Sequence, residues 1–585
     1  MIPMKTQIAP RSGSGGYALV MVMLVTAMAL LVLSASMNWT SQTALLNERN
    51  NQLSTSLFAA EAATEKVLTR MSRDYEVSGE GTVYGNLSQY QALYPTTNES
   101  SYWANFQFSN AQGGSGQTYV QRTATQSYVQ LESVYSGLSG FATTYKIISN
   151  ARQTNGRFNL TNAVQQEVQL ASIPVFQFAI FYNSLLEFTW AAPFTVRGRV
   201  HANNNIYTGS SQPLTFSADV TATGSIQKRT WGGYNVSAMT GSINYQAQKE
   251  TNVTSLTLPI GTNNTAAAVR EVINQPPAGE SSSSAIGQQR YYNKAELQIL
   301  VSNSTVTIKV QQPFDTSPVT INWTNANYFI TTNLSYTDQR EGKTTRTTEI
   351  DVGKLITWSG TNSQVIGKLG SGNPPNILYV ADNRTVTSSQ IAVVRLVNGQ
   401  VLPSRGLTVA TPNPLYVKGH YNVPNAYLGT TNTSSSKPAS LVSDALTILS
   451  PNWNDANSAS SFTSRPSVDT TVNSAILTGD VDSAGANGDT PFSGGVMNLT
   501  RLLEDWGNGA RRLTLNGSIV NLFNSVRATA PWQTPGTYYY APTRDFNFDN
   551  NFLDSTKQPP GTPALRTLIR SKWLNPMANV INYGG

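Results

Sequence analysis

The segment YALVMVMLVTAMALLVLSASM (Tyr17–Met37) runs for about 21 residues without a charged side chain. At 1.5 Å per residue, a helix of that length is roughly 30 Å long, which matches the hydrocarbon thickness of a bilayer. Lys5 and Arg11 precede the segment, and the next charged residue is Glu48. By the positive-inside rule, the sequence predicts a cytoplasmic N-terminus, one membrane helix and an exported remainder. The expected anchor residues of this helix are Tyr17, Leu24, Leu30 and Leu33.

Apolar residues continue beyond this segment at spacings of seven, four, three, seven and four. Such spacing places side chains on one face of a helix. The expected helix-packing stripe consists of Leu46, Leu53, Leu57, Ala60, Val67 and Met71. We therefore expect one long helix that is apolar in its first half and amphipathic in its second. The alternative is a signal peptide cleaved near Ser36, since Ser34-Ala35-Ser36 resembles a small-residue cleavage site, which would release a secreted adhesin.

Two short motifs frame the apolar helix. Gly15-Gly16-Tyr17 resembles a type IV prepilin leader junction, and LNERNNQLSTSLFAAEAATEKVL (residues 46–68) resembles the N-terminal domain of PilX-like minor pilins, with its Phe-x-Ala-Ala-Glu-Ala stretch at Phe58 to Ala62. The resemblance covers roughly residues 11–75. It implies processing between Gly16 and Tyr17, a bacterial inner-membrane anchor, a body in the periplasm or at the cell surface, and packing of the helix against other pilin-like subunits.

One position departs from the pattern of major pilins, which carry Glu at the fifth mature position. Counted from Tyr17, that position is Met21. A buried carboxylate is costly without a partner, and Met avoids that cost but cannot pair with a neighbour's N-terminal amine. The resemblance therefore implies a minor or tip component of a type IV pilus or related secretion filament, with a role in adhesion. A surface or glycan ligand is a further expected partner.

The composition of the remaining chain favours β structure. Charged residues make up 12% of the 585 residues, and Thr, Val, Tyr, Asn and Gly are abundant. The net charge of +7 is spread over the chain without a basic block, so no nucleic-acid partner is expected. The chain has no cysteine, which excludes disulfides, thiolate metal sites and cysteine nucleophiles.

Short apolar runs separated by Gly, Asn and Ser recur in the body, as in PFTVRGRVHANNNIYTGSSQPLTFSADVTATGSI (residues 193–226). This texture predicts a mainly β fold with a β-solenoid (right-handed β-helix-like) body and an inserted α+β unit, although no repeat of fixed length is visible. β-Sandwich domains are the alternative. The predicted organisation is a leader or cytoplasmic segment (1–16), the N-terminal helix (17–75), a small pilin-like β head (76–170), a first solenoid part (171–229), an inserted α+β domain (230–400), a second solenoid part (401–525) and a Pro- and aromatic-rich C-terminal strap (526–585). Within the strap, RTLIRSKWL (residues 566–574) is expected to form a short helix.

Residues able to carry catalysis are sparse. His201 and His420 are the only histidines, and neither stands in a zinc or triad motif, so both are interpreted as structural. A surface glycan-active enzyme on a β-helix scaffold is the alternative function. It needs carboxylates and a basic residue in one groove, and the candidates are scattered single residues: Asp219, Asp382, Asp444 and Arg405.

One short motif has features of a calcium loop. Asp480 and Asp482 alternate ahead of Gly485, but Ala484 stands at the fifth position and Pro491 where a bidentate Glu is needed. A solvated turn is the default interpretation. We therefore expect no catalytic residue, no metal site and no cofactor, and a structural or interaction protein in place of an enzyme.

Overall fold

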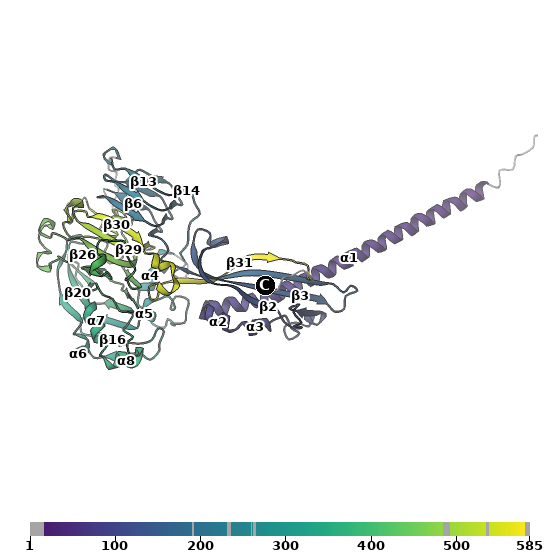
Figure 1. The fold of residues 1–585 in the computed structure, drawn as a ribbon, viewed down its shortest axis with the longest axis horizontal. Helices are drawn as coiled ribbons and strands as arrows, with labels where there is room; N and C mark the ends of the chain where they lie inside the picture. The colour runs from purple at the N-terminus through teal and green to yellow at the C-terminus, as the bar shows by residue number, and fades with distance from the viewer. Residues whose placement is uncertain are drawn as a thin grey trace, which may run out of the picture. The chain divides into compact units, whose positions relative to one another are not determined.

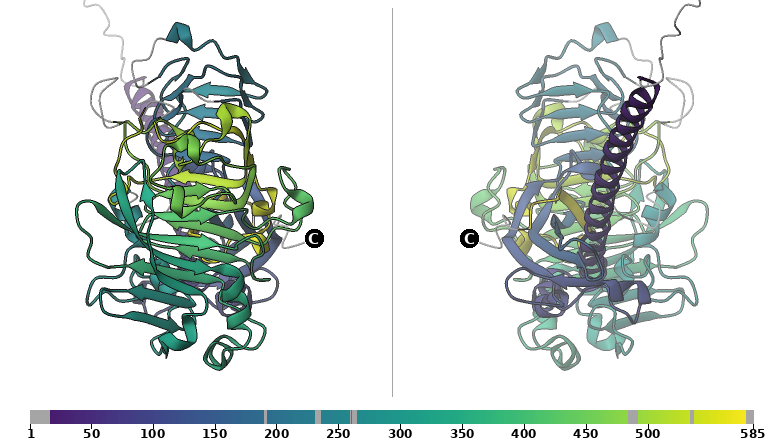
Figure 2. Two further views of the ribbon diagram at one scale, coloured as in Figure 1. Left: turned by 90° about the vertical axis from the view of Figure 1, so that its left-hand side faces the viewer. Right: turned by 90° about the vertical axis from the view of Figure 1, so that its right-hand side faces the viewer.

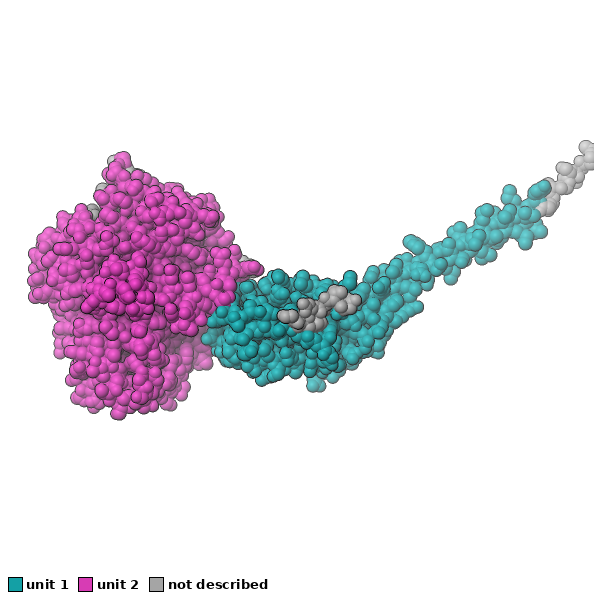
Figure 3. All heavy atoms as spheres, in the orientation of Figure 1, with its two compact units in different colours: residues 1–126, 142–171, 566–585 teal, residues 127–141, 172–565 magenta. Residues whose placement is uncertain are grey.

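A computed structural model of the chain describes residues 17–189, 192–230, 236–258, 260, 265–483, 492–533 and 537–578. The chain forms two compact units (Figure 3). The first, here called the helical unit, comprises Met1–Gln126, Ala142–Ala171 and Arg566–Gly585. The second, here called the body, comprises Ser127–Phe141 and Ser172–Leu565. The chain therefore leaves the helical unit twice and returns to it at the end.

The first element of the helical unit is one uninterrupted helix, α1 (Tyr17–Ser78), of 62 residues (Figure 1). At 1.5 Å per residue it is roughly 90 Å long. Neither glycine nor proline occurs within it, so nothing in the sequence breaks its hydrogen bonding. It ends at Gly79, whose φ of 79° and ψ of −175° form a backbone conformation open chiefly to glycine. The prediction of a long apolar N-terminal helix is confirmed.

A small sheet completes the helical unit. Its strand order is β1-β3-β4-β31, and β2 also pairs with β3. The strands are β1 (Phe106–Ser109), β2 (Tyr119–Gln130), β3 (Ser139–Gln153), β4 (Thr161–Pro174) and β31 (Ala564–Leu574). Two short helices, α2 (Glu80–Gly85) and α3 (Leu87–Gln91), follow α1. The second half of α1 packs on these elements through two apolar clusters, one containing Val67 and Met71 and the other Ala60.

The last strand corrects a prediction. Residues 566–574 were expected to form a short helix, but they lie within β31, which pairs with β4 at the edge of this sheet. The strand buries Ile569, and Leu568 packs partly buried against the cluster of Val67 and Met71. Pairing with a strand some 400 residues earlier in the chain therefore overrides the local helical preference.

The body begins with short strands stacked in parallel ladders. In the first ladder Ile180 pairs with Val200 and Val200 with Val220; in the second, Leu186 pairs with Ile206 and Ile206 with Ile226. Partners lie 20 residues apart, as the Asn183–Asn203 contact also shows. The strands are β5 (Ile180–Tyr182), β6 (Leu186–Thr189), β7 (Phe194–Arg197), β8 (Val200–Ala202), β9 (Ile206–Gly209), β10 (Leu214–Phe216), β11 (Val220–Ala222), β12 (Ile226–Gln227), β13 (Ile243–Tyr245) and β14 (Lys249–Thr251). A 20-residue repeat therefore extends from β5 to β12, although none was evident from the sequence, and the step to the last pair, β13 and β14, is 29 residues, as in Leu214–Ile243 and Val220–Lys249.

A second set of parallel ladders has coils of unequal length. The Thr408–Ser440 contact spans 32 residues, whereas the Asn473–Asn516 contact spans 43. One ladder consists of β21 (Ile377–Asp382), β23 (Leu407–Ala410), β25 (Ala439–Ser443), β27 (Thr470–Thr478) and β29 (Arg512–Asn521). The other consists of β20 (Lys343–Asp351), β22 (Gln390–Val397), β24 (Leu415–Lys418), β26 (Leu446–Leu449) and β28 (Thr500–Arg501). The two sets succeed one another in layers (Figure 2, left).

The two sets join at β29. Its first six residues pair with β30 (Thr543–Phe548), and its last three pair with β5. β30 in turn pairs with β7, so one sheet of 16 strands contains strands of both sets, while β6-β9-β12 and the ladder of β20, β22, β24, β26 and β28 belong to separate sheets. The prediction of a large β-rich body after a long N-terminal helix is confirmed.

Strands from the segment predicted as an inserted domain extend the same sheet. β15 (Leu297–Val301) pairs in parallel with β21, and the antiparallel strands β16 (Val306–Val310) and β17 (Val319–Ile321) follow it. α7 (Val352–Ser359) and α8 (Ser363–Leu369) lie in the same stretch of chain, and Val352 and Val365 belong to the core of the body. The division into seven segments stays a prediction.

Candidate functional site

The first half of α1 exposes its apolar side chains in every direction. The anchor residues predicted from the sequence, Tyr17, Leu24, Leu30 and Leu33, are exposed by 83%, 53%, 63% and 56%. Met21 is exposed by 66%, and Gly16 lies outside the described residues. No described strand of the helical unit lies beside this half of the helix (Figure 1). A helix that is apolar all round is stable only where lipid or other helices cover it.

The threonine hydroxyl groups in this half are bonded to the helix itself. Thr40 donates to the carbonyl of Ser36 at 2.8 Å, Thr43 donates to that of Trp39 at 2.9 Å, and Thr26 bonds the carbonyl of Val22 in the same way. These hydroxyls therefore offer no unsatisfied donor to an apolar environment. With a mean hydropathy of 2.6 over its most apolar window, α1 is long and apolar enough to cross a membrane.

The polar contacts of α1 with other elements of the chain begin at residues 48–53. Glu48 forms an ion pair of 3.4 Å with Arg157, and the side chain of Gln52 accepts from the backbone N–H of Phe158 at 3.0 Å. The side chain of Asn162 donates to the carbonyl of Leu53 at 3.1 Å. These partners lie in or beside the loop between β3 and β4, so this hairpin marks where the packed half of the helix starts.

The residues of the predicted packing stripe become more buried beyond this part of α1. Leu46 is exposed, Leu53 and Leu57 are half-buried, and the remaining three residues are buried: Ala60, Val67 and Met71. The far end of the stripe thus packs inside the chain itself, where it forms part of the two clusters under the sheet. Packing of this stripe against other subunits stays a prediction.

Several polar contacts of the packed half have no signal in the sequence. Thr64 is fully buried, and its hydroxyl accepts from the amide of Gln166 at 2.8 Å. Lys66 donates to the carbonyl of Tyr94 at 2.7 Å and pairs with Glu99 at 2.8 Å. Each partner is at least 28 residues away in the chain, and no local pattern encodes such pairs.

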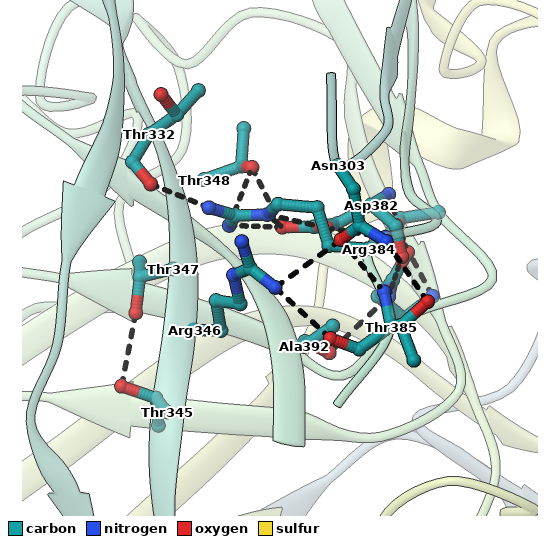
Figure 4. A network of polar contacts seen from close by, with 12 residues as sticks. Asn303, Thr332, Thr345, Arg346, Thr347, Thr348, Asp382, Arg384, Thr385 and Ala392 are labelled. Atoms are coloured by element: carbon teal, nitrogen blue, oxygen red, sulfur yellow. Dashed lines mark hydrogen bonds and ion pairs between the residues drawn. The ribbon is translucent and has the colours of Figure 1, made fainter. Parts of the chain in front are cut away.

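The four candidate residues of the enzyme alternative lie in separate contacts. Asp382 is buried and forms hydrogen-bonded ion pairs with Arg384, whose guanidinium also donates to the carbonyl of Thr332 at 2.6 Å (Figure 4). Asp444 is buried, pairs with Arg270 at 2.8 Å and accepts three backbone N–H groups. Asp219 accepts from the backbone N–H of Gln248 at 3.2 Å, and Arg405 pairs with Glu296 at 3.1 Å. Within the described residues, no hydrogen bond or ion pair joins any two of the four.

The two acids of the calcium-like motif point to different environments. Asp480 is buried, and burial raises its pKa to about 6, whereas Asp482 is exposed. Residues 484–491 of the motif lie outside the described residues. Among the described residues, no group of three His, Asp or Glu side chains is placed to hold a metal ion.

The two histidines make structural contacts. The Nδ1 atom of His420 accepts from the backbone N–H of Thr471 at 3.2 Å. His201 is fully buried, and its ring stacks on Phe181 with centroids 5.4 Å apart. Burial lowers the pKa of both imidazoles, so both are neutral at pH 7.

No protein-family model and no curated protein matches the sequence. Among solved structures, the chain is similar to the competence-associated pilin ComZ from Thermus thermophilus, over 89% of this chain and 98% of that chain, at 9% sequence identity and a TM-score of 0.26. This structural neighbour is a pilin. A likeness at this identity and TM-score establishes neither a shared fold nor a shared function.

Proposed function

We propose that the protein is a membrane-anchored, pilin-like component of a type IV pilus or related secretion filament, in a minor or tip position. The observation that carries the proposal is the contrast within α1. The first half exposes apolar side chains on all sides, whereas the second half is packed under the sheet of the helical unit. Such a helix has two suitable environments, the inner membrane before assembly and the helices of neighbouring subunits afterwards.

The PilX-like character of the subunit is part of the proposal. In the Phe58 to Ala62 stretch, Ala59 and Ala60 are buried in the helical unit, while Phe58 is exposed by 66%. Phe58 is therefore free to pack on a neighbouring subunit. Met21 supports a minor or tip position, because it enters an apolar environment without a charge that needs a partner.

We further propose that the body is a β-solenoid. The parallel ladders with partners 20 residues apart support this assignment, because stacked coils place equivalent residues above one another. Asparagine side chains also stack across successive strands: Asn516 donates to Asn473 at 2.8 Å, and Asn547 donates to Asn516 at 2.8 Å. β-Sandwiches are built from antiparallel sheets, whereas the ladders of this body are parallel.

The proposed role of the body is display and adhesion at the cell surface or in the periplasm, without catalysis or nucleic-acid binding. The separate structural contacts of Asp219, Asp382, Asp444 and Arg405 support a role other than glycan cleavage, which needs two converging carboxylates. A secreted adhesin released by cleavage near Ser36 is the competing proposal.

The experiment is mass analysis of the mature N-terminus in cells with and without an active prepilin peptidase. We expect a chain that begins at Tyr17 only when the peptidase is present. Gly16→Leu should block this processing, whereas the matched control Gly15→Leu should not. An N-terminus that does not depend on the peptidase would contradict the filament role, and a chain in the medium that begins near Met37 would support the secreted adhesin.

A further inference from the structure

The body contains a cavity of about 640 Å³ that none of the preceding functions uses. Small-molecule sites in proteins typically have about 300–1,000 Å³. One wall of the cavity is the loop between β2 and β3 (residues 134–138). A second wall comes from the first set of parallel ladders. The rim is formed by residues 253–257. All of these residues belong to the body.

The side chain of one asparagine joins the rim to the parallel ladders by hydrogen bonds. The side chain of Asn203 donates to the carbonyl of Leu256 at 2.7 Å and accepts the N–H of Leu256 at 2.8 Å. His201 holds this amide, because its Nε2 lies 2.9 Å from Oδ1 of Asn203 and its Nδ1 lies 2.8 Å from the hydroxyl of Thr221. Since Oδ1 of Asn203 is an acceptor, we assign the proton of the neutral ring to Nε2, and Thr221 donates to Nδ1. The rim is therefore preorganised.

On the opposite wall, the backbone of Gly137 lies close to the side chain of Leu256. Gly137 has a φ of 92°, and a Cβ atom there would lie 2.9 Å from the side chain of Leu256. Arg199 donates from Nη2 to the carbonyl of Gly137 at 2.6 Å, and its guanidinium lies 4.5 Å from the ring centroid of Phe178. One face of the guanidinium is thus occupied by the ring.

The lining carries polar groups that have hydrogen-bonding capacity left over. Arg199 and Glu250 have opposite charges, and neither forms an ion pair with a described residue. The exposed side chains of Thr254, Ser255 and Thr257 have no hydrogen-bond partner among the described residues. The lining therefore offers hydroxyls, one donor group and one acceptor group with no net charge, beside the apolar side chains of Val134 and Leu138.

We propose that this cavity binds a short neutral oligosaccharide. Arg199 donates to, and Glu250 accepts from, sugar hydroxyls, while the hydroxyl side chains of the rim add further hydrogen bonds and the apolar residues contact the C–H faces of the ring. Because the charges of Arg199 and Glu250 balance, the lining provides no net attraction for a charged saccharide. The proposal is independent of the filament role, since it depends only on the body.

The test is calorimetric titration of the full chain in a zwitterionic detergent, because detergents with sugar headgroups would compete for the cavity. The probes are maltotriose, cellotriose and chitotriose, with trigalacturonic acid as the charged comparison, each up to about 10 mM, beyond a millimolar Kd. We expect at least one neutral trisaccharide to bind. Its affinity should fall at least about tenfold in Arg199→Gln, which removes the guanidinium, and in Ser255→Trp, which fills the cavity from an exposed position.

Arg346→Gln is the matched control. Arg346 is a half-buried arginine of the body that also donates to a backbone carbonyl, that of Thr385, at 2.9 Å (Figure 4). Its loss should leave saccharide binding unchanged. The proposal is overturned if no neutral trisaccharide binds, if only trigalacturonic acid binds, or if the correctly folded Ser255→Trp variant binds as tightly as the natural chain. An unprocessed N-terminus would not affect these results, so the two proposals fail separately.

Discussion

The two halves of α1 have the same secondary structure and opposite surroundings. Both lack glycine and proline, and both belong to one unbroken helix. In the first half Leu30 is exposed by 63%, whereas in the second half Val67 is completely buried. The comparison teaches that local sequence makes the helix, while long-range packing decides which half the rest of the chain covers. The uncovered half is the part available to lipid or to a neighbouring subunit.

The largest expected effect comes from charge in the uncovered half. Leu24→Arg combined with Leu30→Arg should release the protein from the membrane, since each arginine near the centre of a membrane helix costs about 2.5–3.5 kcal/mol. The measurement is the fraction retained in membranes after an alkaline carbonate wash. Phe58→Arg is the control, because Phe58 is at least as exposed as the two leucines but lies in the second half. Unchanged membrane retention of the double variant would contradict the claim that the first half of α1 lies in the membrane.

Truncation of one methionine in each half tests how much each half contributes to the stability of the helical unit. Met71 is buried, and Met71→Ala should destabilise the helical unit by about 2–5 kcal/mol. Met28 is exposed by 62%, so Met28→Ala should leave the unit's stability unchanged. Hydrogen exchange of the β3 and β4 amides in the detergent-solubilised full chain measures both. Equal protection in the two variants would show that α1 is not held as described.

Two threonines provide a polar version of the same test. Thr64→Val leaves the amide of Gln166 with only the carboxylate of Glu65 at 3.0 Å, and should cost about 1–3 kcal/mol. Thr26→Val removes a hydroxyl that bonds only within its own helix, and should not change unfolding. Thermal unfolding of the two variants against the natural chain measures the difference. A larger loss in Thr26→Val would contradict the assignment of the halves.

The smallest expected effect depends on pH. The hydrogen bond from Lys66 holds the pKa of Glu99 below its usual value, so this contact contributes stability above pH 4.5 that is lost as the pH falls through the lowered pKa. Glu99 is nearly half exposed, and screening by water keeps the contribution below about 1 kcal/mol. After correction for the intrinsic exchange rate at each pH, the protection factors of the amides in residues 94–100 should fall between pH 7 and pH 3 in the natural chain. In Lys66→Met these protection factors should already be lower at pH 7 and should change less with pH.

The anchor could be predicted from the sequence because its evidence is local. An uncharged stretch of helix length and the spacing of Ala60, Val67 and Met71 depend on near neighbours in the chain. The β-rich body could be predicted from composition for the same reason. The strand conformation of residues 566–574 could not be predicted in this way, because β31 forms through its pairing with β4.

The repeat and the cavity were hidden for a different reason. Only Ile180, Val200 and Val220 and their equivalents mark the 20-residue step, and the later coils of 32 and 43 residues obscure it. The cavity brings Gly137, Arg199 and Leu256 together from three separate segments. No motif contains them, and the register of the ladders had to be known before they could be placed side by side.

The central claim concerns where the two halves of α1 lie in the cell, and the chain has no cysteine to interfere with labelling. Leu30→Cys and Phe58→Cys introduce single thiols at positions that are exposed by 63% and 66% in the isolated chain. With a membrane-impermeant maleimide applied to spheroplasts, Phe58→Cys should be labelled at once, and Leu30→Cys only after detergent is added. Equal labelling of both without detergent would contradict a membrane-embedded first half.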